Sequence, residues 1–244
     1  MTRKIAAWLV HLFTASGAII AIWTLIETHQ HNYINALWLM GVAIFIDAVD
    51  GTLARMVNVK QLVPQIDGAL LDNIVDYMNY VITPCFFLWV EPSLIAPSMK
   101  WLVLSSVILA SAYQFTQDDA KTEDHFFKGF PCYWNLVVMY LYLFSASSTI
   151  SCSVLLVLSI LVFIPIKYVY PSRLDYLTTI GWLKVVMSIA SFLYGMHCIA
   201  LLYFYPKIPL FLVFYSMLYI TFYLTFSILR TIAPAFESNK QIKY

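Results

Sequence analysis

The sequence IDAVDGTLARMVNVKQLVPQIDGALLDNIVDYMNYV occupies Ile46–Val81, and it places aspartates at helical spacing within apolar stretches. Asp47 and Asp50 are three residues apart, and Asp72 and Asp76 are four residues apart. Each pair therefore lies on one face of a helix. Because a short turn separates the two pairs, we predict an antiparallel helical hairpin in which the two acidic faces meet.

The composition around this hairpin is that of a membrane protein. The chain has 244 residues, of which 61% are hydrophobic and 11% are charged, whereas about 25% of the residues in a soluble domain are charged. The formal net charge of +1 argues against nucleic acid as a partner. The four cysteines form no C-x-x-C pair, so neither a zinc site nor a disulfide framework is predicted.

Eight apolar segments approach the ~20 residues that a membrane-spanning helix needs. We therefore predict an all-α, polytopic membrane protein that forms a single integral domain over residues 1–244, with the aspartate hairpin at about 33–89. The first segment is longer than the ~7–15 apolar residues of a signal peptide, so it counts as a span. The predicted spans are residues 5–26, 33–55, 66–89, 100–116, 131–147, 150–168, 178–204 and 209–230.

The basic residues predict the orientation of these spans. With both termini in the cytoplasm, twelve of the 14 lysines and arginines fall on the cytoplasmic side, and only Lys100 and Lys207 fall outside. Such an excess of positive charge marks the cytoplasmic side of a membrane protein. The acidic faces of the hairpin then lie at the cytoplasmic boundary of the membrane.

The four aspartates predict a metal site. An aspartate inside a bilayer costs ~2.5–3.5 kcal/mol, and repulsion among four adds to that cost. Arg55 can offset one charge, and a pair of divalent cations can offset the rest. Because all the ligands are carboxylates, Mg²⁺ or Mn²⁺ is favoured. Two such ions form the usual clamp for displacement at phosphorus.

Small residues near the aspartates favour phosphate chemistry. Gly51, Ala54 and Gly68 would let a phosphate or a flat base approach the backbone closely, and the Arg55 guanidinium is a forked donor for phosphate oxygens. A cation-coupled transporter with buried acidic residues remains the alternative.

The complete pattern is Asp47-x-x-Asp50-Gly51-x-x-Ala54-Arg55 followed by Gly68-x-x-x-Asp72-x-x-x-Asp76. It resembles the signature of the CDP-alcohol phosphotransferase family. Twelve residues, 56–67, separate its two halves. This spacer is longer than in most of the family and is similar to that of the bacterial branch whose acceptor is choline. The segments His125–Asn135 and Ile164–Arg173 also resemble that branch.

The resemblance implies an enzyme that transfers a phosphatidyl group from CDP-diacylglycerol to choline and releases CMP. The expected metal ligands for two ions are Asp47, Asp50 and Asp72 with Asp76 nearby, and Asp76 is the expected general base. The residues expected around CDP are Gly51, Ala54, Arg55 and Gly68. A bacterial inner membrane and a homodimer are also implied. The motif does not distinguish choline from serine, inositol or glycerol phosphate.

Aromatic side chains are the candidates for holding choline, because a quaternary ammonium is attracted to ring faces. They lie near predicted cytoplasmic helix ends and are Tyr77, Tyr80, Tyr133, Trp134, Tyr168 and Tyr170. An interfacial aromatic belt is the alternative for each. Lys167 and Arg173 are candidates for a lipid phosphate, with positive-inside topology as the alternative. Glu123 and Asp124 could face the choline cation or be solvated loop acids.

Overall fold

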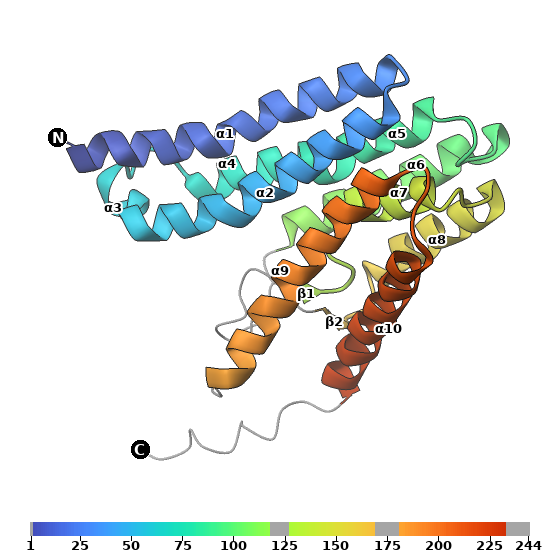
Figure 1. The fold of residues 1–244 in the computed structure, drawn as a ribbon. Coiled ribbons are helices and arrows are strands. Elements are labelled where there is room, and N and C mark those ends of the chain that lie inside the picture. Colours follow the sequence, from blue (N-terminus) through green and yellow to red (C-terminus); the bar gives the residue numbers. More distant parts are fainter. Residues whose placement is uncertain (1, 118–126, 169–180, 233–244) are drawn as a thin grey trace. The chain divides into compact units, whose positions relative to one another are not determined.

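The computed structural model describes residues 2–117, 127–168 and 181–232, which are almost entirely helical (Figure 1). The chain divides into two compact units. The first contains Met1–Thr116 and Cys132–Ser159, and the second contains Gln117–Pro131 and Ile160–Tyr244.

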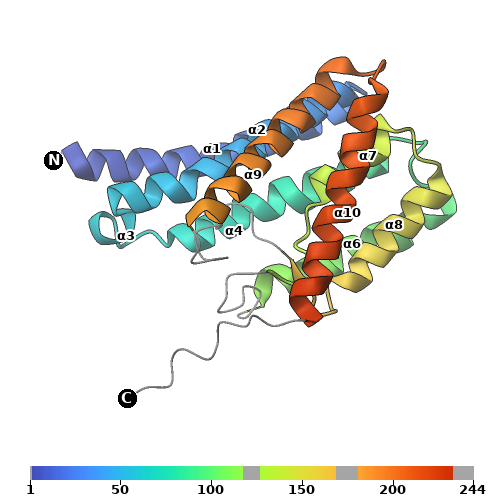
Figure 2. The ribbon, with the colours of Figure 1, turned by 60° about the horizontal axis from the view of Figure 1, so that its bottom comes forward.

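The first unit contains the predicted hairpin. Its elements are α1 (Thr2–His29), α2 (Tyr33–Val57), α3 (Val59–Leu62), α4 (Gly68–Tyr77), the π-helical turn η1 (Met78–Ile82), α5 (Thr83–Val90), the 3₁₀ turn η2 (Pro97–Met99), α6 (Lys100–Thr116), α7 (Trp134–Leu143) and α8 (Ser148–Leu161), whose last two residues belong to the second unit. Helix α1 packs against α2, α4, η1 and α5, and it lies alongside α2 in Figures 1 and 2.

A glycine on α1 allows the close approach of α4. A Cβ atom at Gly17 would lie 2.6 Å from Cγ1 of Val75, so a side chain at this position would force the helices apart. The side-chain amide of Asn79 donates a hydrogen bond to the Gly17 carbonyl oxygen over 3.0 Å. Small-residue contacts of this kind let helix backbones pack closely in membranes.

Local caps define the turn between α2 and α4. Asn58 adopts a left-handed conformation with φ 59° and ends α2, a conformation that asparagine tolerates better than most residues. The Asp67 carboxylate accepts hydrogen bonds from the N–H groups of Ala69 and Leu70 at 3.0 and 3.1 Å, which caps α4. Between these caps, Val59 and Val63 are buried in the same apolar cluster as residues of α1.

The third predicted span is continuous but not uniformly α-helical. Helix α4, turn η1 and helix α5 follow one another without a break over residues 68–90. In the π-helical turn, three consecutive residues are buried: Asn79, Tyr80 and Val81. The wider π turn faces more consecutive side chains inward than an α-helix does, and π turns are frequent at functional sites.

The prediction of an all-α, polytopic membrane protein is confirmed. Each of the eight predicted spans overlaps a helix of the described chain, and the helices long and apolar enough to cross a membrane are Arg3–His29, Tyr33–Val57 and Leu210–Leu229. Shorter apolar helices are Trp134–Leu143, Ser148–Leu161 and Ile189–Phe204.

Two predicted spans were too long. Helix α8 ends at Leu161, whereas the sequence predicted helix to residue 168. Pro165 disfavours helix at the residue before it and has no N–H to donate. Residues Lys167–Tyr168 instead form strand β2, which pairs antiparallel with β1, Phe127–Lys128. Helix α7 covers residues 134–143 of the predicted span 131–147, because Pro131 is followed by Cys132 at φ 57°.

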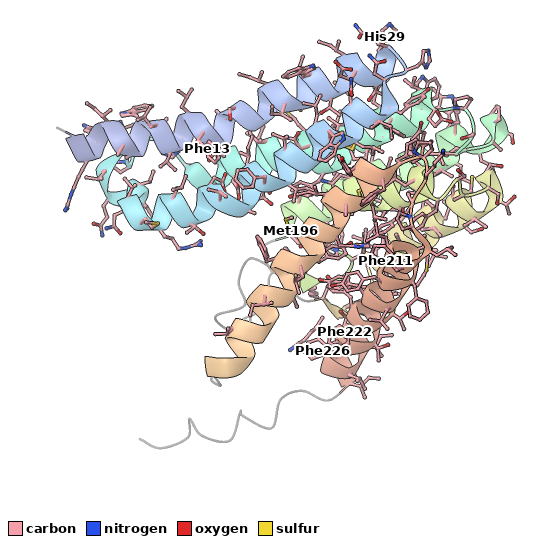
Figure 3. The ribbon with its side chains drawn as sticks, viewed as in Figure 1. Phe13, His29, Met196, Phe211, Phe222 and Phe226 are labelled. Carbon is pink, nitrogen blue, oxygen red and sulfur yellow. The ribbon has the colours of Figure 1, made fainter. Side chains whose placement is uncertain are left out.

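The second unit joins this strand pair to a helical hairpin, α9 (Gly181–Phe204) and α10 (Leu210–Ile232). His197 Nε2 lies 2.7 Å from Ser216 Oγ, so these two buried polar side chains of α9 and α10 satisfy each other. Met196 and Phe211 line an apolar groove of about 480 Å³, and Phe222 lies beside Phe226 at the far end of α10 (Figure 3). Such exposed apolar surface suits contact with lipid rather than water.

Candidate active site

Three of the four predicted aspartates meet in the first unit. Asp47 and Asp50 lie one turn apart on α2, and Asp72 lies on α4. Each offers a carboxylate oxygen, and the three oxygens lie within 4.8 Å of one another. Asp50 is buried and the other two are half-buried. The acidic faces therefore meet as the helical spacing predicted.

The three carboxylates of this group lie close enough to repel one another. The Asp50 side chain is within hydrogen-bonding reach of two others, the Asp72 carboxyl group and the Thr14 hydroxyl of α1. Carboxylates this close repel one another unless a proton or a cation lies between them. Three oxygen ligands from two helices fit a hard divalent ion such as Mg²⁺ or Mn²⁺.

Asp76 lies one turn after Asp72 on α4 and is half-buried. Among the described residues it is not a member of the group within 4.8 Å. It interacts electrostatically with Tyr80 of the π-helical turn. Its position beside the group, rather than in it, suits a carboxylate that handles a proton.

The Arg55 side chain folds back along α2. Its Nη2 donates a hydrogen bond to Thr52 Oγ1 over 3.1 Å, and its Nη1 lies 3.4 Å from the position that a Cβ of Gly51 would occupy. The exposed guanidinium also attracts the Asp50 carboxylate. A Cβ at this position would therefore only touch the end of the Arg55 side chain. Ala54 is half-buried on the same helix and packs against the apolar cluster that contains Val59 and Val63.

His11 of α1 adjoins the site and was not selected from the sequence. A Cβ at Gly68 would lie 3.1 Å from His11 Cε1, so the glycine lets the start of α4 approach the imidazole. His11 is buried, and its Nε2 has no hydrogen-bond partner among the residues that the structure describes. The spacing His11-x-x-Thr14 places both residues on one face of α1. This spacing is the feature of the sequence that could have identified His11 as a neighbour of the site.

The aromatic candidates have different positions. The Tyr80 hydroxyl donates a hydrogen bond to Asp47 Oδ2 over 2.7 Å. Tyr133 is half-buried, with its ring 6.1 Å from that of Tyr80. Trp134 is fully buried, and its indole N–H donates to Ser111 Oγ over 2.7 Å. The Tyr77 hydroxyl donates to the Ile108 carbonyl oxygen.

The remaining candidates belong to the second unit or lie outside the described residues. The Lys167 backbone N–H donates to Thr231 Oγ1 over 2.8 Å. Tyr168 is buried, with its ring 6.2 Å from Phe130 and 6.1 Å from Tyr223, so its surroundings are those of a core residue. The predicted residues that lie outside the described part of the chain are Glu123, Asp124, Tyr170 and Arg173.

Comparison with known proteins agrees with the aspartate pattern. A family model described as CDP-alcohol phosphatidyltransferase matches residues 5–165. The chain is 52% identical over 239 residues to a phosphatidylcholine synthase of Legionella pneumophila subsp. pneumophila, covering 98% of this chain and 94% of that protein. It is 52% identical over 217 residues to a phosphatidylcholine synthase of Legionella bozemanae, covering 89% of this chain and 100% of that protein.

A more distant relative gives the same result. The chain is 42% identical over 194 residues to a phosphatidylcholine synthase of Borreliella burgdorferi, covering 77% of this chain and 82% of that protein. The family resemblance and the prediction of an enzyme are confirmed, whereas the transporter alternative gains no support. The chain therefore belongs to the CDP-alcohol phosphatidyltransferase family.

Proposed function

We propose that this enzyme transfers the phosphatidyl group of CDP-diacylglycerol to choline, giving phosphatidylcholine and CMP. The observation that carries the proposal is the similarity, over nearly the full length, to proteins named phosphatidylcholine synthase. The aspartate group supports it, since three carboxylates that meet at one point suit the handling of a pyrophosphate.

We place two Mn²⁺ or Mg²⁺ ions at Asp47, Asp50 and Asp72, with Asp76 at the edge of the site. When bound, such ions neutralise the carboxylates and stabilise the negative charge that develops on the phosphate oxygens and on the leaving CMP. The residues that we place around the CDP moiety are Gly51, Ala54, Arg55 and Gly68. In this arrangement Arg55 offers donors to phosphate oxygens, and the lack of a side chain at Gly51 leaves room for the nucleotide beside the backbone.

Asp76 is the proposed general base. It accepts the proton of the choline hydroxyl, and the choline oxygen forms a bond to the phosphorus on the lipid side of the pyrophosphate. The bond between that phosphorus and the bridging oxygen breaks, and CMP leaves with the electron pair. Because Asp76 lies one turn from Asp72, this base would be beside the reacting phosphorus.

The proposed location is a bacterial inner membrane, with both termini and the aspartate site on the cytoplasmic side. The distribution of lysine and arginine supports this orientation, and the substrate CDP-diacylglycerol is a membrane lipid. We also propose that residues 1–244 act as one integral membrane domain and that the enzyme is a homodimer, as the family resemblance implies.

An acceptor screen tests the proposed reaction. Purified enzyme with CDP-diacylglycerol and Mn²⁺ should release CMP when choline is added. Serine, inositol and glycerol phosphate should support a rate at least about tenfold lower, which corresponds to about 1.4 kcal/mol of discrimination. CMP release and labelled lipid product are both measured. A preference for serine or inositol would overturn choline as the acceptor and leave the family chemistry intact.

Tyr133 is the aromatic residue that we propose for choline recognition. Its half-buried ring lies next to Tyr80, which contacts Asp47. Trp134 has no exposed ring face, so we do not include it. Replacing Tyr133 with Leu keeps apolar bulk and removes the ring quadrupole, an interaction worth ~0.5–2 kcal/mol. The KM for choline should therefore rise about 2- to 30-fold.

The KM for CDP-diacylglycerol should stay nearly unchanged in this variant. Tyr140→Leu is the matched control, because Tyr140 is also half-buried and lies on α7, with its ring 5.6 Å from Phe144. It should leave both constants unaltered. Equal effects of Tyr133→Leu on the two substrates would indicate a packing role and remove Tyr133 from the proposed choline site.

A further inference from the structure

We infer that Tyr80 is a positioning residue that holds the Asp47 carboxylate in the orientation needed for binding a divalent cation. The Tyr80 hydroxyl donates a hydrogen bond to Asp47 Oδ2 over 2.7 Å. The tyrosine is only 6% exposed, so water does not compete strongly for this bond. The inference rests on the proposed function, since it assigns Tyr80 to the metal site proposed there.

The fold holds Tyr80 in place from more than one side. Its neighbour Asn79 donates side-chain hydrogen bonds to the carbonyl oxygens of Gly17 and Val75, each over 3.0 Å. The Tyr133 ring lies 6.1 Å from the Tyr80 ring. Asn79 thus attaches the π-helical turn to α1, while Tyr80 attaches it to α2. The phenol has little freedom to leave Asp47.

Asp47 needs such a partner because of its surroundings. The carboxylates of Asp47, Asp50 and Asp72 converge within 4.8 Å, and their repulsion favours rotation of a half-buried side chain away from the group. A hydrogen bond to Oδ2 opposes that rotation and fixes the direction of the other carboxylate oxygen. Groups that orient metal ligands in this way typically contribute about 10- to 100-fold to metal affinity.

The position of Tyr80 in the sequence agrees with this role. Tyr80 follows Asp72 and Asp76 at successive four-residue intervals, and it interacts electrostatically with Asp76 as well as bonding to Asp47. The phenol therefore adjoins carboxylates of both helices of the hairpin. Its hydroxyl thus bonds to a proposed ligand and lies in the electrostatic field of the proposed base.

Tyr80→Phe is the test, because it removes one hydroxyl and keeps the buried ring. Mn²⁺ binding to the detergent-solubilised protein is measured without substrate, from the loss of the free-ion signal in electron paramagnetic resonance. The Kd for Mn²⁺ should rise about 10- to 100-fold. The Mn²⁺ concentration for half-maximal activity should rise by a similar factor, while the rate at saturating Mn²⁺ recovers to within about threefold of wild type.

Tyr77→Phe is the matched control, because Tyr77 is the last residue of α4, directly before the π-helical turn. Its hydroxyl donates to the Ile108 carbonyl oxygen over 3.3 Å, outside the carboxylate group, so Mn²⁺ binding should not change. If the Tyr80→Phe variant binds Mn²⁺ with wild-type affinity, the role of Tyr80 is overturned, whereas the proposed metal site is not. A wild-type protein that binds no Mn²⁺ would overturn the proposed metal site and the inference with it.

A double-mutant cycle separates positioning from general loss of packing. In an Asp47→Ala background the acceptor of the Tyr80 hydroxyl is gone, so Tyr80→Phe should change the Mn²⁺ Kd by less than about threefold. The melting temperature in EDTA identifies any misfolded variant. If the two substitutions reduce Mn²⁺ affinity additively, Tyr80 does not act through Asp47 and the inference fails.

Discussion

Asp50→Asn is expected to lower the rate of phosphatidyl transfer by at least about a thousandfold, equivalent to about 4 kcal/mol of transition-state stabilisation. Asp50 is the most buried member of the carboxylate group, within hydrogen-bonding reach of Asp72 and Thr14. The asparagine has nearly the same shape but removes one negative charge and one ligand oxygen. CMP release with purified variant, choline and excess Mn²⁺ measures the loss.

In this variant the melting temperature should not fall together with the activity. With EDTA present, wild-type Asp47, Asp50 and Asp72 repel one another, and Asp50→Asn removes part of that repulsion. The melting temperature in EDTA should therefore be equal to or higher than that of wild type, as is common for residues retained for function. An Asp50→Asn protein with full activity would sink the metal-site proposal.

Asp67→Asn is the matched control for this experiment. Asp67 is exposed and caps α4 through its Oδ1, which asparagine can replace with little loss. The substitution makes the same change of charge next to Gly68, outside the carboxylate group. Activity should stay within about threefold of wild type, since both residues cap helices equally well.

Exhaustive treatment with EDTA is expected to abolish activity completely. The proposed ligands are all carboxylate oxygens, so Mg²⁺ or Mn²⁺ should restore CMP release better than Zn²⁺, which prefers nitrogen and sulfur ligands. Turnover is followed as each metal is titrated back. EDTA saturated beforehand with Mn²⁺ is the control, and it should leave the rate unchanged. Undiminished turnover after chelation would contradict a metal role in catalysis.

Much of the fold was predictable because its determinants are local. Long apolar segments give membrane helices regardless of their neighbours, since unpaired backbone groups are too costly in lipid. The errors came at segment ends. Residues 162–168 are as apolar as a helix requires, but Pro165 and the pairing of Phe127–Lys128 with Lys167–Tyr168 end α8 early. Strand pairing joins segments far apart in the chain, which composition does not show.

The aromatic residues also show the difference between what local sequence predicts and what tertiary packing decides. From the sequence, Tyr133 and Trp134 were the main candidates for choline, and Tyr80 was one of the other aromatic residues near them. In the structure, Trp134 is bonded to Ser111 in the core, Tyr80 is bonded to Asp47, and Tyr133 lies half-buried beside Tyr80. Which hydroxyl or indole N–H finds which partner depends on the faces that α6, α7 and the π-helical turn present to one another.

The sequence by itself determined the all-α membrane class and the pairing of Asp47 with Asp50 and of Asp72 with Asp76, because helical periodicity and hydrophobicity act within a single segment. Only the tertiary structure decided that Asp50 is buried against Thr14, that His11 borders Gly68 and that a π-helical turn directs Tyr80 to Asp47. These contacts join residues of different helices, and the packing of those helices sets distances that no local pattern encodes.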